Sequence, residues 1–137
     1  MSKVDCVLDT NILVYAITGQ GIKCERASAL VQSANWGISA QILQEFYVTV
    51  TRKPVPPLSP ATAAAFVEQF RKFPCIPIDS DIVESAIAHS ERYRISYWDG
   101  AIIAAAEVLG ASTLYSENLQ HGQQYGPVRA LNPFAGQ

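Results

Sequence analysis

Acidic residues stand at the points of the sequence where predicted strands end. Asp9 directly follows a short apolar run, and Glu45 lies about one turn into the helix predicted after a second run. Asp99 falls in the first turn of a later predicted helix, and Glu117 comes just past another apolar run. Ligands bind where the carboxyl ends of parallel strands meet at one edge of a sheet. We therefore expect these four side chains to converge as candidate catalytic and metal-binding residues.

Carboxylates brought this close together cannot all ionise unaided. Two of them about 5 Å apart repel each other by about 3 kcal/mol at an effective dielectric constant of about 20. Either some take up protons or a cation lies among them. An all-oxygen site favours Mg²⁺ or Mn²⁺ over Zn²⁺, and no histidine lies near the first three acids. Such an ion can activate water and stabilise charge on a phosphoryl oxygen, which indicates hydrolysis of a phosphodiester bond.

Each acid also has a purely structural alternative. Asp9 can simply cap the helix that follows it. Asp99 stands three residues after a serine in a capping-box pattern, and can serve only to hold the start of its helix. Glu45 and Glu117 can be exposed acids on a helix and a loop. The prediction of a metal site therefore depends on the four acids occurring together at strand ends.

The elements that must position these acids alternate between strands and helices. Apolar runs predict strands at residues 4–8, 36–38, 75–78 and 112–115, with a weak fifth at 128–131. Helical spacing and capping residues predict helices after Asp9, at 22–34, after Ser39, from Pro60, after Asp79 or Ser80, and from Ser96 to Leu109. This alternation predicts an α/β three-layer sandwich, in which helices flank a central parallel sheet of four to five strands.

The composition favours one folded domain. A chain of 137 residues has the size of an ordinary domain and can bury about two-thirds of its unfolded surface. A hydrophobic content of 49% and a charged content of 16% exclude a disordered or coiled-coil protein. A net charge of −2 excludes a strongly basic nucleic-acid-binding protein, so any nucleic-acid site must be local. We expect a single domain over residues 1–137.

The sequence also predicts the compartment. Its three cysteines form no C-x-x-C pair and are too few for a disulfide framework, which fits a reducing environment. The N-terminus lacks the apolar run of a signal peptide, and no stretch is long and apolar enough to span a membrane. We expect a cytoplasmic protein that does not contact the membrane.

The segments around the four acids resemble the motifs of PIN-domain nucleases. VLDTNIL at 7–13 looks like the opening motif, and SYWDGAIIAAA at 96–106 is similar to the third. QEFY at 44–47 and LYSENL at 114–119 match the second and fourth less specifically, and LNPF at 131–134 looks like the tail of bacterial members. The resemblance extends from about residue 4 to residue 134.

This resemblance implies a PIN-like fold and a Mg²⁺- or Mn²⁺-dependent endoribonuclease. Many small bacterial and archaeal members are toxins of VapC-type toxin–antitoxin pairs, which are usually homodimers that cleave RNA and are inhibited by a small antitoxin. Carried over by position, Asp9, Glu45 and Asp99 would be metal ligands, and Asn11 would help to hold the loop after the first strand. The family commonly has aspartate where this chain has Asn118. Either Glu117 replaces it or a fourth carboxylate is absent, which puts a second metal ion in doubt.

Several residues near the motifs form a second group of candidates. Ser116 and Asn118 flank Glu117, and His121 lies on the following loop, where it can contact phosphate, transfer a proton or simply be exposed. Trp98, next to Asp99, can stack on an unpaired base, or can pack in the core or at a dimer contact.

Two alternatives compete with the nuclease hypothesis. The first is a non-catalytic PIN-fold module that binds RNA or a protein partner, and the amide at Asn118 and the weakly acidic net charge favour it. The second is a phospho-acceptor receiver domain. That class is excluded because Asp9 has no adjacent acid and no lysine follows Lys72.

Overall fold

The protein is built around a six-stranded, mostly parallel sheet. The structure, a computed structural model, describes residues 3–136. The sheet has the order β3-β2-β1-β4-β6-β5, and only β5 runs antiparallel to its neighbour. Its strands are β1 (Cys6–Leu8), β2 (Trp36–Ser39), β3 (Cys75–Ile76), β4 (Thr113–Tyr115), β5 (Gln124–Tyr125) and β6 (Val128–Leu131). The predicted parallel α/β sandwich is confirmed.

Two details of the sheet differ from the prediction. The sequence did not indicate β5, because this strand has only two residues and begins with the exposed, polar Gln124. It forms a hairpin with β6 through Gly126, whose φ of 60° suits a tight turn. The third strand ends at Ile76 rather than at residue 78, since the next residue, Pro77, has no N–H to donate to a neighbouring strand.

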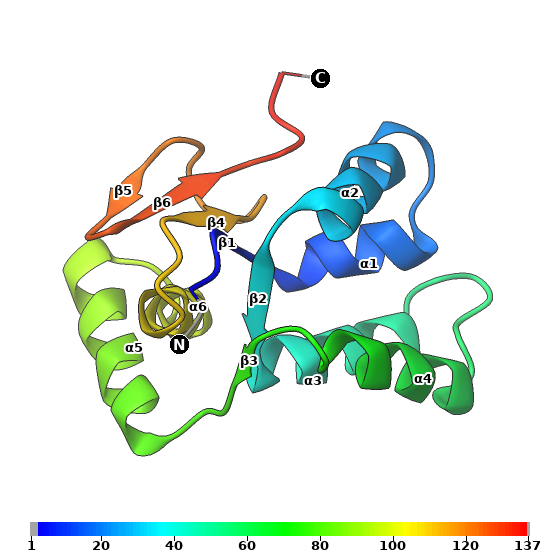
Figure 1. Cartoon of the computed structure of the whole chain (residues 1–137), viewed down its shortest axis with the longest axis horizontal. Coiled ribbons are helices and arrows are strands. Elements are labelled where there is room, and N and C mark those ends of the chain that lie inside the picture. The colour runs from blue at the N-terminus through cyan, green and yellow to red at the C-terminus, as the bar shows by residue number, and fades with distance from the viewer. Residues whose placement is uncertain (1–2, 137) are drawn as a thin grey trace.

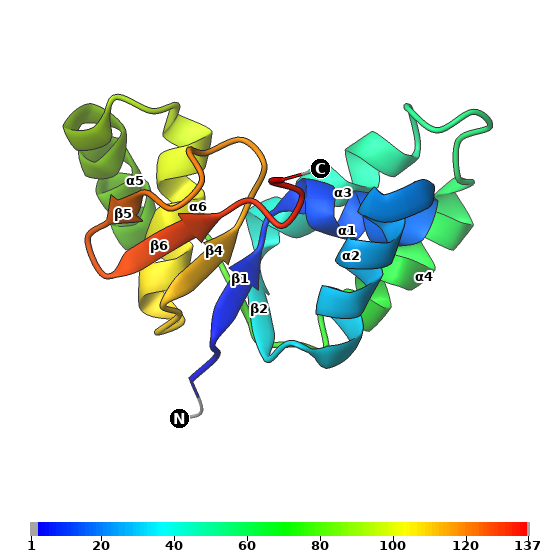
Figure 2. The same cartoon turned by 90° about the horizontal axis from the view of Figure 1, so that it is seen from above.

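Six helices lie on the two sides of this sheet (Figures 1 and 2). They are α1 (Thr10–Thr18), α2 (Gly21–Ser33), α3 (Ala40–Val50), α4 (Pro60–Phe70), α5 (Ser80–Tyr93) and α6 (Tyr97–Val108). Figure 2 shows α5 and α6 together on one side, and α1 to α4 gathered on the other. Helix α6 packs across β2, β4 and β6, and α5 packs against α6.

Helices α3 to α6 begin at capping residues that the sequence predicted. The side chains of Ser39, Asp79 and Ser96 each accept a hydrogen bond from a backbone N–H in the first turn of α3, α5 and α6. Ser59 caps α4, which then starts with Pro60. These caps fix where each helix begins, and therefore where an acid in its first turn, such as Asp99, lies.

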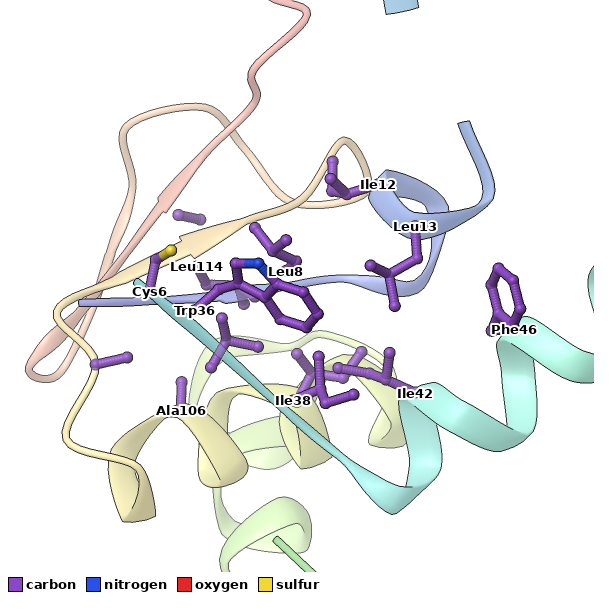
Figure 3. Packing of buried hydrophobic residues seen from close by; sticks show 14 of the residues in the cluster. Cys6, Leu8, Ile12, Leu13, Trp36, Ile38, Ile42, Phe46, Ala106 and Leu114 are labelled. Atoms are coloured by element: carbon purple, nitrogen blue, oxygen red, sulfur yellow. The ribbon is translucent and has the colours of Figure 1, made fainter. Parts of the chain in front are cut away.

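Buried apolar side chains from both sides of the sheet form one connected core (Figure 3). Trp36 on β2 is 1% exposed and stacks on Phe73 with ring centroids 3.8 Å apart. Helix α6 approaches α5 closely at Gly100, where an added Cβ would lie 2.6 Å from the carbonyl oxygen of Ala86. The core thereby holds the start of α6, and Asp99 with it, in a fixed place. Within residues 3–136 no helix is long and apolar enough to cross a membrane.

Candidate active site

A cavity of about 520 Å³ opens where the polypeptide leaves the carboxyl ends of β1 and β2. Three of the four predicted acids, Asp9, Glu45 and Asp99, line it together. They come from the end of β1, the middle of α3 and the first turn of α6. The remaining lining residues are Thr10, Asn11, Gln41, Gln44, Val48, Thr49, Trp98, Ile102 and Asn118. None of these described residues is a lysine or an arginine.

Asp9 is the most deeply buried of the three acids, with 4% of its surface exposed. The N–H of Thr10 donates to its Oδ1 over 2.7 Å, and the hydroxyl of Ser116 donates to its Oδ2 over 2.6 Å. The pKa of Asp9 is raised to about 6, mainly by burial and to a smaller extent by the charges of Asp99 and Glu45, while the two hydrogen-bond donors lower it. Asp9 therefore both caps α1 and carries a carboxylate that is costly to ionise.

Glu45 is held by two polar neighbours on the cavity wall. The hydroxyl of Thr10 donates to its Oε1 over 2.6 Å. The amide of Gln41, one helical turn earlier on α3, donates to its Oε2 over 3.4 Å. These contacts orient the carboxylate in the cavity, so Glu45 is not an isolated surface acid.

Asp99 combines the two roles that the sequence left open. Its backbone N–H donates to Ser96 Oγ over 3.0 Å, as the cap of α6 requires, while its side chain lines the cavity. Burial raises the pKa of the Asp99 carboxyl above its usual range; a hydrogen bond from Ser96 lowers it and the charge of Glu45 raises it.

Glu117 is placed differently from the other three acids. Its carboxylate accepts hydrogen bonds from the amide of Asn11, over 3.2 Å, and from the hydroxyl of Tyr15. It also pairs with Lys23 on α2 over 3.1 Å. Glu117 does not line the cavity; its neighbour Asn118 does. The loop after β4 therefore presents an amide rather than a carboxylate to the other acids.

The remaining candidates divide in the same way. Ser116 is fully buried and accepts a hydrogen bond from the N–H of Asn118 over 3.1 Å while it donates to Asp9, so it links the fourth motif to the first. His121 is exposed and lies outside the cavity lining, and its Nδ1 accepts a hydrogen bond from the N–H of Asn132.

Comparison with known proteins supplies the family. The sequence model described as the PIN domain matches residues 6–123, which is most of the chain. The chain belongs to the PIN domain family. Among curated proteins, no sequence match is found.

Solved structures of low sequence identity share the PIN fold. A chain of a toxin–antitoxin complex from Klebsiella pneumoniae is 20% identical with a TM-score of 0.72, over 95% of this chain and 98% of that one. VapC20 from Mycobacterium tuberculosis, described as a toxin that cleaves the sarcin–ricin loop, is 19% identical with a TM-score of 0.70, over 91% and 99%. A chain of FitAB bound to a DNA fragment is 19% identical with a TM-score of 0.66, over 96% and 97%.

The donor atoms of this PIN domain suit a hard divalent cation. Three carboxylates and the amide of Asn118 line the cavity, and Mg²⁺ and Mn²⁺ prefer such oxygen ligands. Burial, with a smaller effect from neighbouring carboxylates, raises the pKa of Asp9 and of Asp99, so the fold disfavours their ionised forms and a cation beside them would favour those forms. In the part of the chain that the structure describes, no three His, Cys, Asp or Glu side chains are close enough to enclose an ion as they stand. Binding therefore requires side-chain movement or additional ligands such as water.

Sequence reasoning missed three residues that support the acids of the PIN domain. The signal that could have indicated Thr10 is its place beside Asp9. For Gln41 it is the spacing of four residues before Glu45, which puts both on one face of a helix. Lys23, which neutralises Glu117, has no local signal, since 94 residues separate the two partners.

Proposed function

We propose that this PIN domain is a Mg²⁺- or Mn²⁺-dependent endoribonuclease and the toxin of a toxin–antitoxin pair. One observation carries the catalytic part of the proposal: Asp9, Glu45 and Asp99, from three separate elements, line a single cavity. Carboxylates this close together repel one another, so their ionised forms are stable only when a cation compensates the charge; otherwise some of them take up protons. The toxin assignment draws on the family and on the toxin–antitoxin complexes that share the fold.

In the proposed mechanism, Asp9, Glu45 and Asp99 would hold the ion, and the side-chain oxygen of Asn118 would add a neutral ligand. When bound, the ion supplies an activated water and stabilises charge on the phosphoryl oxygens. Thr10 keeps the Glu45 carboxylate turned toward the cavity through its hydrogen bond of 2.6 Å. Asp99 lines the cavity and is less buried than Asp9, so its carboxylate would be accessible to a water molecule there.

Glu117 receives a positioning role in this proposal. Its charge is compensated by Lys23, and its carboxylate holds the side chain of Asn11 in the turn that follows Asp9. With an amide at Asn118, the cavity then offers three carboxylates. This count favours one tightly bound ion over two.

The proposal includes partners that the sequence resemblance suggested. These are an RNA substrate, a small antitoxin protein that inhibits the toxin, and a second copy of the chain in a homodimer. A cytoplasmic location, where the RNA substrate would be found, belongs to the same proposal.

RNA cleavage by the purified protein tests the proposal. We expect cleavage with Mg²⁺ or Mn²⁺ that stops when the metal is chelated, and loss of cleavage in Asp9→Asn. Asp5→Asn is a matched control, because Asp5 is an exposed acid next to β1 that lies outside the cavity lining. Equal activity in Asp9→Asn and in the unaltered protein would overturn the assignment.

The alternative is a non-catalytic PIN module that binds RNA or a protein. It is favoured by the amide at Asn118 and by the spacing of the described acids, which do not enclose an ion as they stand. Calorimetric titration with Mn²⁺ separates the two functions. Heat of binding that Asp9→Asn removes supports the nuclease, whereas no binding in either protein supports the module.

A further inference from the structure

One large aromatic side chain on the cavity wall remains without a role. Trp98 lies in the first turn of α6, directly before Asp99, and is 62% exposed. It therefore does not belong to the core, in contrast to the other tryptophan, Trp36, which is 1% exposed. An exposed apolar residue is ordinary by itself. Trp98 differs because it lines the same cavity as the three acids.

The backbone of Trp98 is held firmly. Gln41, a buried side chain on α3, donates its amide to the carbonyl oxygen of Trp98 over 3.3 Å. The ring of Tyr97 meets the indole edge to face, with centroids 5.0 Å apart and an interplanar angle of 84°. The same Gln41 amide also donates to Glu45, so this side chain links the backbone of Trp98 to one of the acids of the cavity.

The charge of the cavity limits how a nucleic acid can bind there. Three carboxylates and no lysine or arginine are found among its described lining residues, so phosphate groups gain no ion pair with the walls. Val48, on α3, adds apolar surface to the wall and is 46% exposed. The other polar side chains of the lining carry neutral hydroxyls and amides, which can hydrogen-bond to the RNA but add no ion pair. The exposed indole face of Trp98 adds a surface that is well suited to stacking on a base.

We infer that Trp98 stacks on an unpaired base of the RNA beside the cleaved phosphate, and so determines specificity in the nuclease proposed above, on which this inference rests. A base inside a duplex is already stacked on both faces and cannot take up this position. The base that stacks on Trp98 must therefore be unpaired, in a single strand or in a loop of the RNA. Purines, with their larger ring surface, should bind better than pyrimidines.

The protein's own fluorescence allows a direct binding test. The chain has two tryptophans, and the other one is buried against Phe73. Oligoadenosine, added with Ca²⁺ in place of Mg²⁺ to limit cleavage, should quench the emission of Trp98. An abasic strand with the same number of phosphates is the matched probe and should quench it far less. Equal quenching by both strands, or by neither, would overturn the inference.

Variants at position 98 test the same contact by kinetics. Trp98→Ala should weaken oligoadenosine binding and raise KM by about 5- to 100-fold, the range for loss of one base–aromatic stack. Its kcat should fall less, and Trp98→Phe should recover most of the affinity. Val108→Ala is the control, because Val108 is a 58% exposed apolar residue on the same helix outside the cavity lining. An unchanged KM in Trp98→Ala would refute the stacking role.

A protein partner on Trp98 is the competing outcome. Acrylamide should quench the tryptophan fluorescence of the unaltered protein more strongly than that of Trp98→Phe, because the indole of Trp98 is accessible to solvent. Equal quenching, together with a change of oligomeric state in Trp98→Ala during sedimentation, would show that a second chain covers the ring and would exclude the base-stacking role. Absence of RNA cleavage in the unaltered protein, with base-dependent quenching intact, would instead refute only the nuclease function.

Discussion

Replacing Asp9 by asparagine should remove activity and at the same time stabilise the metal-free protein. The Asp9 side chain is 4% exposed, and burial raises the pKa of its carboxyl from 3.8 to about 6. Its ionised form is therefore disfavoured by the fold at neutral pH. An asparagine is neutral, has almost the same shape, and can still accept the hydrogen bond from the N–H of Thr10.

The size of the effect follows from the two pKa values. The difference between 3.8 in the unfolded chain and about 6 in the folded protein corresponds to about 3 kcal/mol, at about 1.4 kcal/mol per pKa unit. Asparagine changes the contact with Ser116, because the NH₂ that takes the place of Oδ2 cannot accept the hydrogen bond that the Ser116 hydroxyl donates to the carboxylate. We therefore expect a gain of about 1 to 3 kcal/mol, or a melting temperature raised by about 3 to 10 °C.

The pH dependence has a definite sign. Because the folded pKa of Asp9 lies above the unfolded value, the penalty is complete above about pH 6 and absent below about pH 4. The difference in free energy of unfolding between Asp9→Asn and the unaltered protein should be largest at pH 7 to 8. It should shrink as the pH falls through this window, where the carboxyl becomes protonated in both states.

Urea denaturation in the presence of a chelator, repeated across this pH range, measures the difference. Asp5→Asn, which changes an exposed acid, should show none of it. Addition of Mg²⁺ should stabilise the unaltered protein more than Asp9→Asn, because an ion that binds only the folded state adds to its stability. If Asp9→Asn is less stable at pH 7.5 without metal, the reasoning about Asp9 is wrong.

Three further substitutions probe the supports of the site. Thr10→Val removes the hydroxyl that orients Glu45 and should lower Mn²⁺ affinity or kcat by about 10- to 100-fold, as measured by calorimetry and RNA cleavage. Lys23→Ala breaks a partly exposed ion pair with Glu117, and should cost no more than about 1 kcal/mol in urea denaturation while the Mn²⁺ stoichiometry stays constant; a changed stoichiometry would make Glu117 a ligand. Gly100→Ala would place a Cβ 2.6 Å from a backbone carbonyl of α5 and should destabilise the fold by about 1 to 3 kcal/mol, so an unchanged melting temperature would mean that α5 moves freely.

The sequence predicted the frame of the fold because its signals are local. Alternating apolar runs gave the parallel sheet, and capping residues such as Ser39 and Ser96 gave the helix starts. The hairpin strand β5 was missed, because two residues are too few to show the alternation of apolar and polar side chains that predicts a strand. Its formation depends on the turn at Gly126. That residues 1–137 form a single domain stays a prediction.

The candidate site was predictable to the extent that topology decides it. Asp9 and Glu45 line one cavity because they follow the carboxyl ends of the neighbouring parallel strands β1 and β2. Asp99 joins them because α6, which follows α5 and leads into β4, begins at the same cavity. The direction in which Glu117 points depends on Lys23, which is distant in sequence, and no local pattern indicates that pairing. The exposure of Trp98 also follows from tertiary packing rather than from its place in a helix.

The absence of positive side chains from the described cavity wall has a consequence for control of the enzyme. Without an ion, the three carboxylates repel a polyanion, so the cavity disfavours binding of RNA, the proposed substrate. If the proposed function holds, the divalent cation is needed for RNA binding as well as for catalysis. The concentration of divalent ions would then control both the binding of RNA and the rate of its cleavage. Monovalent salt would have comparatively little influence on either.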